Sequence, residues 1–206
     1  MKVGLFGGSF NPPHLAHLIV AELVREQFGL DQVLWIPALI PPHKRESRLA
    51  SAEHRLEMTR LAVASNPAFA VSDLELRRSG VSYTVDTVRT LQTANPSVSY
   101  FLIIGGDSFR GFSSWYRPQE ILERVPLIVY ERGGRARAEM DTSLKGRVCF
   151  ADAPRIDISS TAIRERCAQG RSIRYLVPEP VREYIIMRGL YREEEGIGPV
   201  RAEGLP

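Results

Sequence analysis

The sequence predicts an α/β protein, a three-layer sandwich in which a mainly parallel β-sheet is covered by helices on both faces. Short apolar segments alternate with segments of helical periodicity, which is typical of parallel strands joined by crossover helices. The expected strands are apolar on both sides, as strands buried in a parallel sheet are. In such sheets ligands bind beyond the carboxyl ends of the strands, so the loops that follow the strands are the candidate sites.

Glycine and proline mark the ends of the expected elements in the first half of the chain. Gly7-Gly8 ends the first strand, and Gly29 supplies the stop of the first helix. Pro37 breaks the second strand, and Asn66-Pro67 closes the second helix. The expected elements are strand Lys2–Phe6, helix Leu15–Phe28, strand Val33–Ile36, helix Ala52–Ala64 and strand Phe69–Leu76.

The second half continues the alternation of helices and strands. Gly105-Gly106 ends a third buried apolar strand, and a further helix is expected to begin with Ser160 as its N-cap. Gly133–Gly146 is basic and lacks periodicity, so we expect a mobile loop there. The other expected elements are helix Val85–Leu91, strand Tyr100–Ile104, helix Gln119–Glu123, strand Leu127–Tyr130 and strand Val148–Phe150.

Length and composition indicate a globular protein of one domain. We expect residues 1–192 to form this domain and residues 193–206 to be a disordered tail. Hydrophobic residues make up 44% and charged residues 25%, as in ordinary globular proteins. No stretch of roughly 18 apolar residues predicts a membrane span. The opening residues lack the long apolar region of a signal peptide.

The cysteines and the charge limit the compartment and the partners. Cys149 and Cys167 are isolated, which argues against a disulfide framework or a cysteine zinc site and favours the cytoplasm. The net charge of +3 and the pI of about 9.0 suit an anionic partner such as a nucleotide, and equally a basic protein without one.

The loop after the first strand predicts a phosphate site. Gly8, Ser9 and Phe10 offer backbone N–H groups where glycine allows a ligand to approach closely. His14 and His17 stand three residues apart at the start of a helix, so their rings share the face near its positive end. Two imidazoles there are suited to donating to polyphosphate oxygens. The alternatives are a two-histidine metal site, for which no third ligand is evident, and a pair of ordinary polar residues.

Two later loops add candidates at other strand ends. Lys44 lies in a proline-bracketed basic loop, where it either delivers positive charge to a site or belongs to a solvated turn. Gly106 and Asp107 follow the third strand, where a carboxylate can bind ribose hydroxyls. Trp115, in the loop beyond them, is either a stacking platform for a heteroaromatic ring or a core anchor.

A run of hydroxyl residues at a helix start predicts an anion cradle. Ser159, Ser160 and Thr161 are more than one cap requires, and Arg164 lies in the first turn. Backbone amides, hydroxyls, the helix dipole and a guanidinium together bind anions. The alternative is a well-capped surface helix.

These motifs together resemble the nucleotidylyltransferase superfamily, and within it the bacterial nicotinate mononucleotide adenylyltransferases, from Lys2 to about Tyr191. Neither a P-loop nor the G-x-G-x-x-G fingerprint of dehydrogenases is present. The superfamily motifs G-x-F-x-P-x-H-x-G-H and I-S-S-T-x-I-R resemble Gly8–His17 and Ile158–Arg164. The likeness to the adenylyltransferases is carried by Pro41–Lys44, Ser82–Thr87, Gly105–Asp107 with Trp115, Tyr175–Pro178, Tyr184-Ile185 and Gly189–Tyr191. Two residues depart from the pattern: Ala16 replaces a glycine, and Asn11 stands where an acidic residue is frequent.

The resemblance implies a Rossmann-like fold and assigns roles to the candidate residues. Backbone at Gly8, Ser9 and Phe10 would line the nucleotide site, and Asp107, next to Gly106, would bind ribose. Thr84 and Trp115 would hold the nicotinate side. The residues implied to contact phosphate groups, and so to carry catalysis, are His14, His17, Lys44 and Arg164, helped by Ser159, Ser160 and Thr161.

The implied reaction joins ATP to nicotinate mononucleotide, with release of pyrophosphate, in the biosynthesis of NAD. Mg²⁺ would be held mainly by the phosphates and water, so no protein metal site is expected. No nucleic-acid polymer or membrane is expected as a partner, and a homo-oligomer is left open. The alternatives are a related enzyme that uses nicotinamide mononucleotide, phosphopantetheine or a cytidylyl donor, and a nucleotide-binding protein without turnover.

Overall fold

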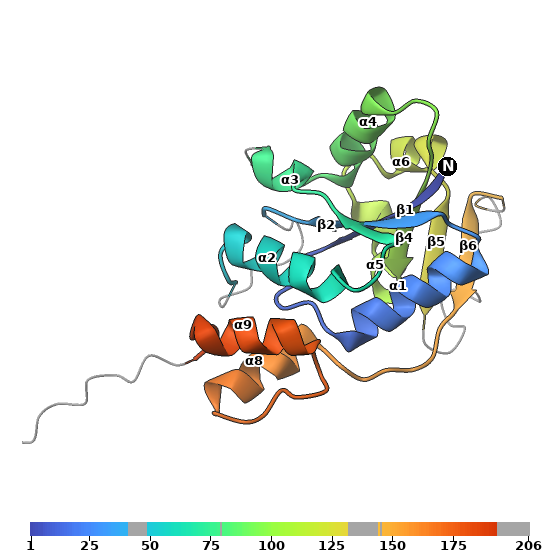
Figure 1. Ribbon diagram of the computed structural model, residues 1–206. Coiled ribbons are helices and arrows are strands. Elements are labelled where there is room, and N and C mark those ends of the chain that lie inside the picture. The colour runs from blue at the N-terminus through green and yellow to red at the C-terminus, as the bar shows by residue number, and fades with distance from the viewer. Residues whose placement is uncertain (41–48, 79, 132–143, 145, 193–206) are drawn as a thin grey trace, which may run out of the picture.

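The computed structural model contains a six-stranded parallel sheet with the strand order β3-β2-β1-β4-β5-β6 (Figure 1). It describes residues 1–40, 49–78, 80–131, 144 and 146–192. Strands β1 to β3 are added toward one edge of the sheet and β4 to β6 toward the other, so the order of strands switches between β1 and β4, the position at which parallel sheets bind ligands. The strands are β1 Lys2–Gly8, β2 Gln32–Pro37, β3 Phe69–Val71, β4 Ser99–Gly105, β5 Leu127–Glu131 and β6 Val148–Asp152.

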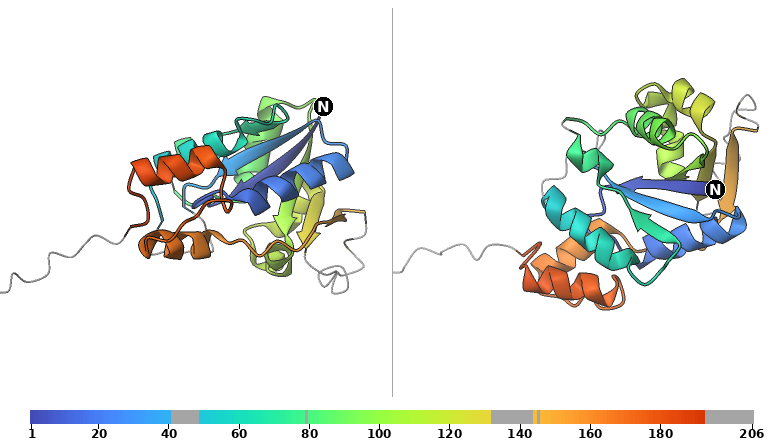
Figure 2. Two further views of the ribbon diagram at one scale, coloured as in Figure 1. Left: turned by 60° about the horizontal axis from the view of Figure 1, so that its bottom comes forward. Right: turned by 45° about the horizontal axis from the view of Figure 1, so that its top comes forward.

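Helices cover both faces of the sheet, which confirms the predicted three-layer sandwich (Figure 2). One hydrophobic core holds buried residues of α1, α2, α8 and α9, and the other holds those of α4, η1 and α6. The helices are α1 Leu15–Gln27, α2 Ala52–Val63, α3 Leu74–Arg77, α4 Thr84–Ala94, α5 Gly106–Arg110, 3-10 helix η1 Phe112–Ser114, α6 Pro118–Arg124, α8 Ser160–Ala168 and α9 Glu179–Met187.

One expected strand is shorter than its pattern indicated. The alternating residues Phe69–Leu76 form a strand only as far as Val71, and α3 follows. The Ser72 hydroxyl accepts a hydrogen bond from the Leu74 N–H at 3.3 Å, and the Leu76 N–H bonds to Asp73 O at 2.9 Å. Side-chain capping therefore turns the backbone away from the sheet at Ser72-Asp73, a local competition that the apolar alternation conceals.

The C-terminal helices α8 and α9 lie against the α1 and α2 side of the molecule (Figure 1). The Tyr184 hydroxyl and His54 Nδ1 are 2.9 Å apart and join α9 to α2. The first N–H of α1, from Leu15, donates to Leu176 O at 3.0 Å. Sequence periodicity did not predict α9, which joins α2, while Leu176 in the segment before α9 helps to fix the start of α1. Within the described residues, no helix has the length and apolar character to cross a membrane.

Several sequence predictions concern residues outside the described part of the chain. They are Lys44 with its loop, the tail 193–206 and all but Leu144 and Gly146 of the expected loop Gly133–Gly146. These predictions, and the assignment of 1–192 to a single domain, stay predictions.

Candidate active site

A cavity of about 520 Å³ opens at the carboxyl ends of the central strands and receives residues from both faces of the sheet. Predicted site residues from four separate segments line it, which confirms their expected proximity but not their roles. Gly106 and Arg164 are not among the residues that line the cavity. The predicted residues that do are Gly8, Ser9, Phe10, His14, His17, Thr84, Asp107, Trp115, Ser159, Ser160 and Thr161.

The loop after β1 holds its backbone toward the cavity in an unusual conformation at Phe10. This residue has φ of 47°, a left-handed value that costs a non-glycine residue about 1–3 kcal/mol. Its ring is 3% exposed and packs 5.1 Å from the Trp35 ring and 5.4 Å from the His17 ring. Burial and ring packing of Phe10 stabilise this left-handed turn at the edge of the cavity.

The two histidines form a stacked pair at the start of α1. Their ring centroids are 3.6 Å apart with an interplanar angle of 21°. The His14 backbone N–H donates to His17 Nδ1 at 3.2 Å. A neutral His17 ring accepting at Nδ1 must carry its proton on Nε2, which makes Nε2–H a hydrogen-bond donor. The rings are thereby oriented by the helix start itself.

Helix α8 is fastened to the loop after β1, about 150 residues earlier in the sequence. The Ser160 hydroxyl donates to Pro12 O at 2.8 Å, and Arg164 Nη1 donates to Asn11 O at 2.9 Å. Arg164 Nη2 lies 3.3 Å from Thr161 Oγ1, and the Arg164 residue is 8% exposed. These contacts explain how the two motifs come to share one cavity.

The predicted cap of α8 was wrong by one residue. Ser159 is the N-cap, and its hydroxyl accepts from the Ala162 N–H at 3.2 Å. Ser160 belongs to the first turn of α8, where its hydroxyl donates to Pro12 O. All three hydroxyls that suggested a ligand site thus have structural partners as well, because Thr161 Oγ1 accepts from Arg164 Nη2.

Arg55, in α2, organises the same loops, and the sequence analysis missed it. It is 1% exposed and donates to four backbone carbonyls from separate stretches of chain. They are Ser9 O at 3.0 Å, Ala38 O at 2.6 Å, Leu39 O at 3.1 Å and Ala50 O at 3.0 Å. One guanidinium therefore ties the loop after β1 to the loop after β2 and to the start of α2.

Asn11 receives a structural role that its departure from the motif left open. Its side-chain oxygen accepts from the Ala50 N–H at 3.1 Å and from the Tyr191 hydroxyl at 2.8 Å. An oxygen that accepts two hydrogen bonds is equally available on a carboxylate. This explains how asparagine fills a position where an acidic residue is frequent.

Ala16, which replaces a glycine of the superfamily motif, is not among the residues that line the cavity. It is 7% exposed, and instead lines a separate hollow of about 70 Å³ with residues of β5 and the segment after β6. The alanine therefore adds no group to the lining of the larger cavity, although His17 borders both spaces.

The opposite side of the cavity carries Thr84, the first residue of α4, and Trp115, which caps the end of η1. Trp115 is half-buried and packs on Phe112, with ring centroids 5.3 Å apart. Trp115 is therefore anchored to the core and also lines the cavity, while its role as a stacking surface stays a prediction.

The segment after β4 brings Asp107 to the rim of the cavity, with its side chain exposed to solvent. Asp107 lines the cavity and pairs with Arg110 one turn later. Gly106 has a packing reason, since an added Cβ would lie 2.9 Å from Glu131 Cβ. The glycine thus lets α5 approach β5, and no direct ligand contact is needed to explain it.

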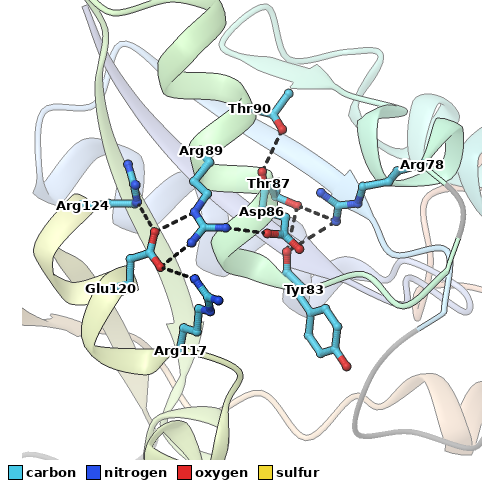
Figure 3. Close-up of polar contacts among 9 residues, drawn as sticks. All are labelled: Arg78, Tyr83, Asp86, Thr87, Arg89, Thr90, Arg117, Glu120 and Arg124. Atoms are coloured by element: carbon cyan, nitrogen blue, oxygen red, sulfur yellow. Dashed lines mark hydrogen bonds and ion pairs between the residues drawn. The ribbon is translucent and has the colours of Figure 1, made fainter.

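A charged cluster holds α4 against α6 beside this side of the cavity (Figure 3). Arg89 Nε and Nη2 donate to the two Glu120 oxygens at 2.6 and 2.5 Å. Arg124 Nε and Arg117 Nη1 reach the same carboxylate at 2.9 and 3.4 Å. Since α4 begins at Thr84 and α6 follows Trp115 closely, the cluster fixes the relative position of these two residues.

These hydrogen bonds, above all those from Arg89, lower the pKa of Glu120 to about 2 from 4.5. A carboxyl group whose pKa is lower in the folded than in the unfolded state stabilises the fold at pH values above the unfolded-state pKa. This stabilisation is lost as the pH falls toward the folded-state pKa. We therefore expect the difference in unfolding free energy between wild type and Glu120→Gln to be constant above about pH 5 and to shrink between about pH 4.5 and 2. Urea unfolding at several pH values measures it. A difference that stays constant down to pH 2 would contradict the assignment, and added salt should reduce it.

The sequence and the fold of this chain are similar to those of known proteins. A model of the family described as Cytidylyltransferase-like matches residues 5–166. A "Probable nicotinate-nucleotide adenylyltransferase" of Salinibacter ruber is 56% identical over 192 residues, covering 93% of this chain and 98% of the relative. One of the same name from Enterococcus faecalis is 44% identical and covers 94% and 86%. In fold, the chain is similar to Plasmodium falciparum nicotinic acid mononucleotide adenylyltransferase complexed with NaAD, with a TM-score of 0.75, 20% identity and coverage of 92% and 97%. The chain belongs to the cytidylyltransferase-like family and, within it, to the nicotinate-nucleotide adenylyltransferases.

Proposed function

We propose that the protein transfers the adenylyl group of ATP to nicotinate mononucleotide, giving nicotinate adenine dinucleotide and pyrophosphate for NAD biosynthesis. The observation that carries this proposal is the two-sided cavity. Stacked histidines and the start of α8 lie on one face of the sheet, while Thr84 and Trp115 lie on the other. A dinucleotide product has its phosphates in the middle and its ring systems at the two ends, which suits such a cavity.

In the proposed reaction, a phosphate oxygen of the mononucleotide attacks the α-phosphorus of ATP in line. A new P–O bond forms, the bond to pyrophosphate breaks, and its electron pair leaves with the pyrophosphate. The attacking oxygen is already anionic, so the step requires no general base and no covalent enzyme intermediate. Catalysis then consists of positioning and of neutralising charge on the phosphates.

The chain's own residues divide this work between them. His17 donates from Nε2 and His14 stacks against it, so this pair contacts the ATP phosphates. Backbone at Gly8, Ser9 and Phe10 lines the nucleotide site. Lys44 and the α8 residues Ser159, Ser160, Thr161 and Arg164 bind the polyphosphate end.

Arg164 requires a qualification of this role that follows from its contacts. It is buried and donates to Asn11 O, so its first action is to hold α8 against the loop after β1. Its charge still acts on phosphates over a short distance, because buried charges are weakly screened.

Mg²⁺ enters with ATP as part of the substrate. The described residues contain no group of three or more His, Cys, Asp or Glu side chains placed to hold a metal ion. The donors that line the phosphate side suit oxyanions rather than cations. We therefore propose that phosphate oxygens and water hold the ion.

Trp115 provides the stacking surface for the pyridine ring, and Asp107 binds ribose. Replacing Trp115 by alanine should raise the KM for the mononucleotide roughly 10- to 100-fold, the scale of one lost ring-stacking contact. The KM for ATP should change little, because the phosphate side does not depend on this ring. Steady-state kinetics with each substrate varied in turn measures both constants. A rise confined to the KM for ATP would contradict the assignment of Trp115 to the pyridine ring.

The experiment that tests the function measures pyrophosphate release from ATP and Mg²⁺ with one acceptor at a time. Nicotinate mononucleotide should give the highest kcat/KM among nicotinate mononucleotide, nicotinamide mononucleotide and phosphopantetheine. A preference for another acceptor would retain the chemistry and overturn the substrate assignment. Release with none of them would overturn the proposed activity.

Two cysteines without a disulfide in the described residues accord with the cytoplasm as the proposed compartment.

A further inference from the structure

A buried carboxyl group that the proposed reaction does not use lines the Thr84 side of the cavity. Glu75, in α3, is 7% exposed and is one of the cavity-lining residues. Carboxyl groups are rarely buried without partners, because removing their charge from water is costly. Burial accordingly raises the pKa of Glu75 above its ordinary value, against the opposing effect of its hydrogen bonds.

The partners of Glu75 come from the segment that starts α4. The Thr87 hydroxyl lies 2.6 Å from Glu75 Oε1 and 3.4 Å from Tyr83 O, so its single proton is donated to Glu75. Arg78 Nη2 donates to the same hydroxyl at 3.3 Å and to Tyr83 O at 3.4 Å, as Figure 3 shows. Thr87 stands three residues after Thr84, so both side chains lie on the same side of α4.

A second hydroxyl links Glu75 to the loop after β2. The Ser82 hydroxyl accepts a hydrogen bond from the Leu39 N–H at 3.0 Å and also bonds to the Glu75 carboxyl group. A hydroxyl has two lone pairs and one proton, so Ser82 accepts from Leu39 and donates to the Glu75 carboxyl group, a hydrogen bond that lowers the pKa of Glu75 against the larger effect of burial. Ser82 and Thr87 therefore bracket Thr84, and both are held by one carboxyl group.

We propose that Glu75 is a positioning residue that sets Thr84 and the start of α4 for the mononucleotide acceptor, without touching the reacting atoms. This inference rests on the proposed function and extends it to how the acceptor side is built. Arg55 and Asn11 hold the phosphate side, and this network meets that of Glu75 at Leu39, whose carbonyl accepts from Arg55 and whose N–H donates to Ser82. The contact between Glu75 and Thr87 does not involve Leu39. Loss of the Glu75 contacts should consequently affect the acceptor and spare ATP.

The test compares steady-state constants for both substrates in four variants with those of the wild type. Glu75→Gln weakens the contacts from one side, and Thr87→Val removes the hydroxyl from the other at nearly constant volume. Thr87→Ser retains the hydroxyl. Thr90→Val is the matched control, because this exposed hydroxyl on the same helix bonds to Asp86 O at 2.8 Å, away from the cavity.

Glu75→Gln and Thr87→Val should raise the KM for the acceptor roughly tenfold, the scale of one lost hydrogen bond to a charged group. Their KM for ATP should stay within about twofold, and Thr87→Ser and Thr90→Val should behave like the wild type. Should Glu75→Gln fail to fold, Thr87→Val decides.

An unchanged acceptor KM in folded Thr87→Val, or equal rises in the KM for both substrates, would overturn the proposal. An inactive wild type would instead count against the proposed function. In that case, direct binding of nicotinate mononucleotide by calorimetry still decides whether Thr87→Val weakens the acceptor side.

Discussion

Replacing His17 by alanine should lower kcat by about two to three orders of magnitude, the usual cost of losing one donor to transition-state charge. In the proposed reaction His17 donates to the phosphates from Nε2–H, since its Nδ1 accepts from the His14 N–H. Charge grows on the leaving pyrophosphate as the bond to the α-phosphorus breaks, so the donor matters most in the transition state. The KM for either substrate should change far less than kcat.

The matched control for this variant is His54→Ala. His54 is also a histidine near a helix start, but its ring bonds to the Tyr184 hydroxyl and does not line the cavity. Its loss should leave kcat within about threefold of the wild type, since it touches no substrate. A folded His17→Ala variant with near-normal kcat would remove His17 from the mechanism.

Replacing Arg55 by methionine should lower the free energy of unfolding by about 3–5 kcal/mol, because buried carbonyls would lose a charged donor. At this chain length the melting temperature should fall by about 10 °C. The four carbonyls come from the loops on both sides of the phosphate site, so kcat/KM should fall in the folded fraction as well. Chemical denaturation and steady-state kinetics measure the two effects.

Arg60→Ala serves as the control for Arg55, since both residues lie on α2. Arg60 is exposed and, in the part of the chain that the structure describes, pairs with Glu57 at 3.8 Å, a type of contact that contributes about 0–1 kcal/mol. A similar loss of stability in both variants would show that the helix, rather than the Arg55 contacts, is what matters.

Most of the sheet could be predicted from the sequence, because glycine and proline end its strands at visible positions. The strand predicted at Phe69–Leu76 failed because the Ser72 hydroxyl competes locally for the backbone. The same mistake concealed the burial of Glu75. In the predicted strand, its position would not have indicated a contact with Thr87, whereas on α3 it is buried and bonded to that residue. A local pattern cannot reveal a partner on a different helix.

Arg55 shows a signal that was present but not used. It stands on the same helical stripe as Met58, Thr59 and Ala62, all of which are buried. An arginine on a buried stripe indicates a buried charge with backbone partners, since arginine otherwise stays at the surface. Its acceptors lie as far as 46 residues away, so the partners themselves could not be read from the sequence.

The candidate site was predicted more completely than its supports. The motif around His14 and the one around Arg164 were each read as phosphate-binding, and the structure brings them to one cavity through Asn11 and Pro12. Which backbone groups they bind depends on packing over about 150 residues of separation, which spacing within a motif does not contain.

A crystal structure of the protein with nicotinate adenine dinucleotide tests the central claim most directly. The two-sided cavity predicts the pyridine ring on Trp115 and the phosphates within hydrogen-bonding distance of His17 Nε2 and the start of α8. A dinucleotide bound in the reverse direction, or outside this cavity, would contradict the assignment of the two sides.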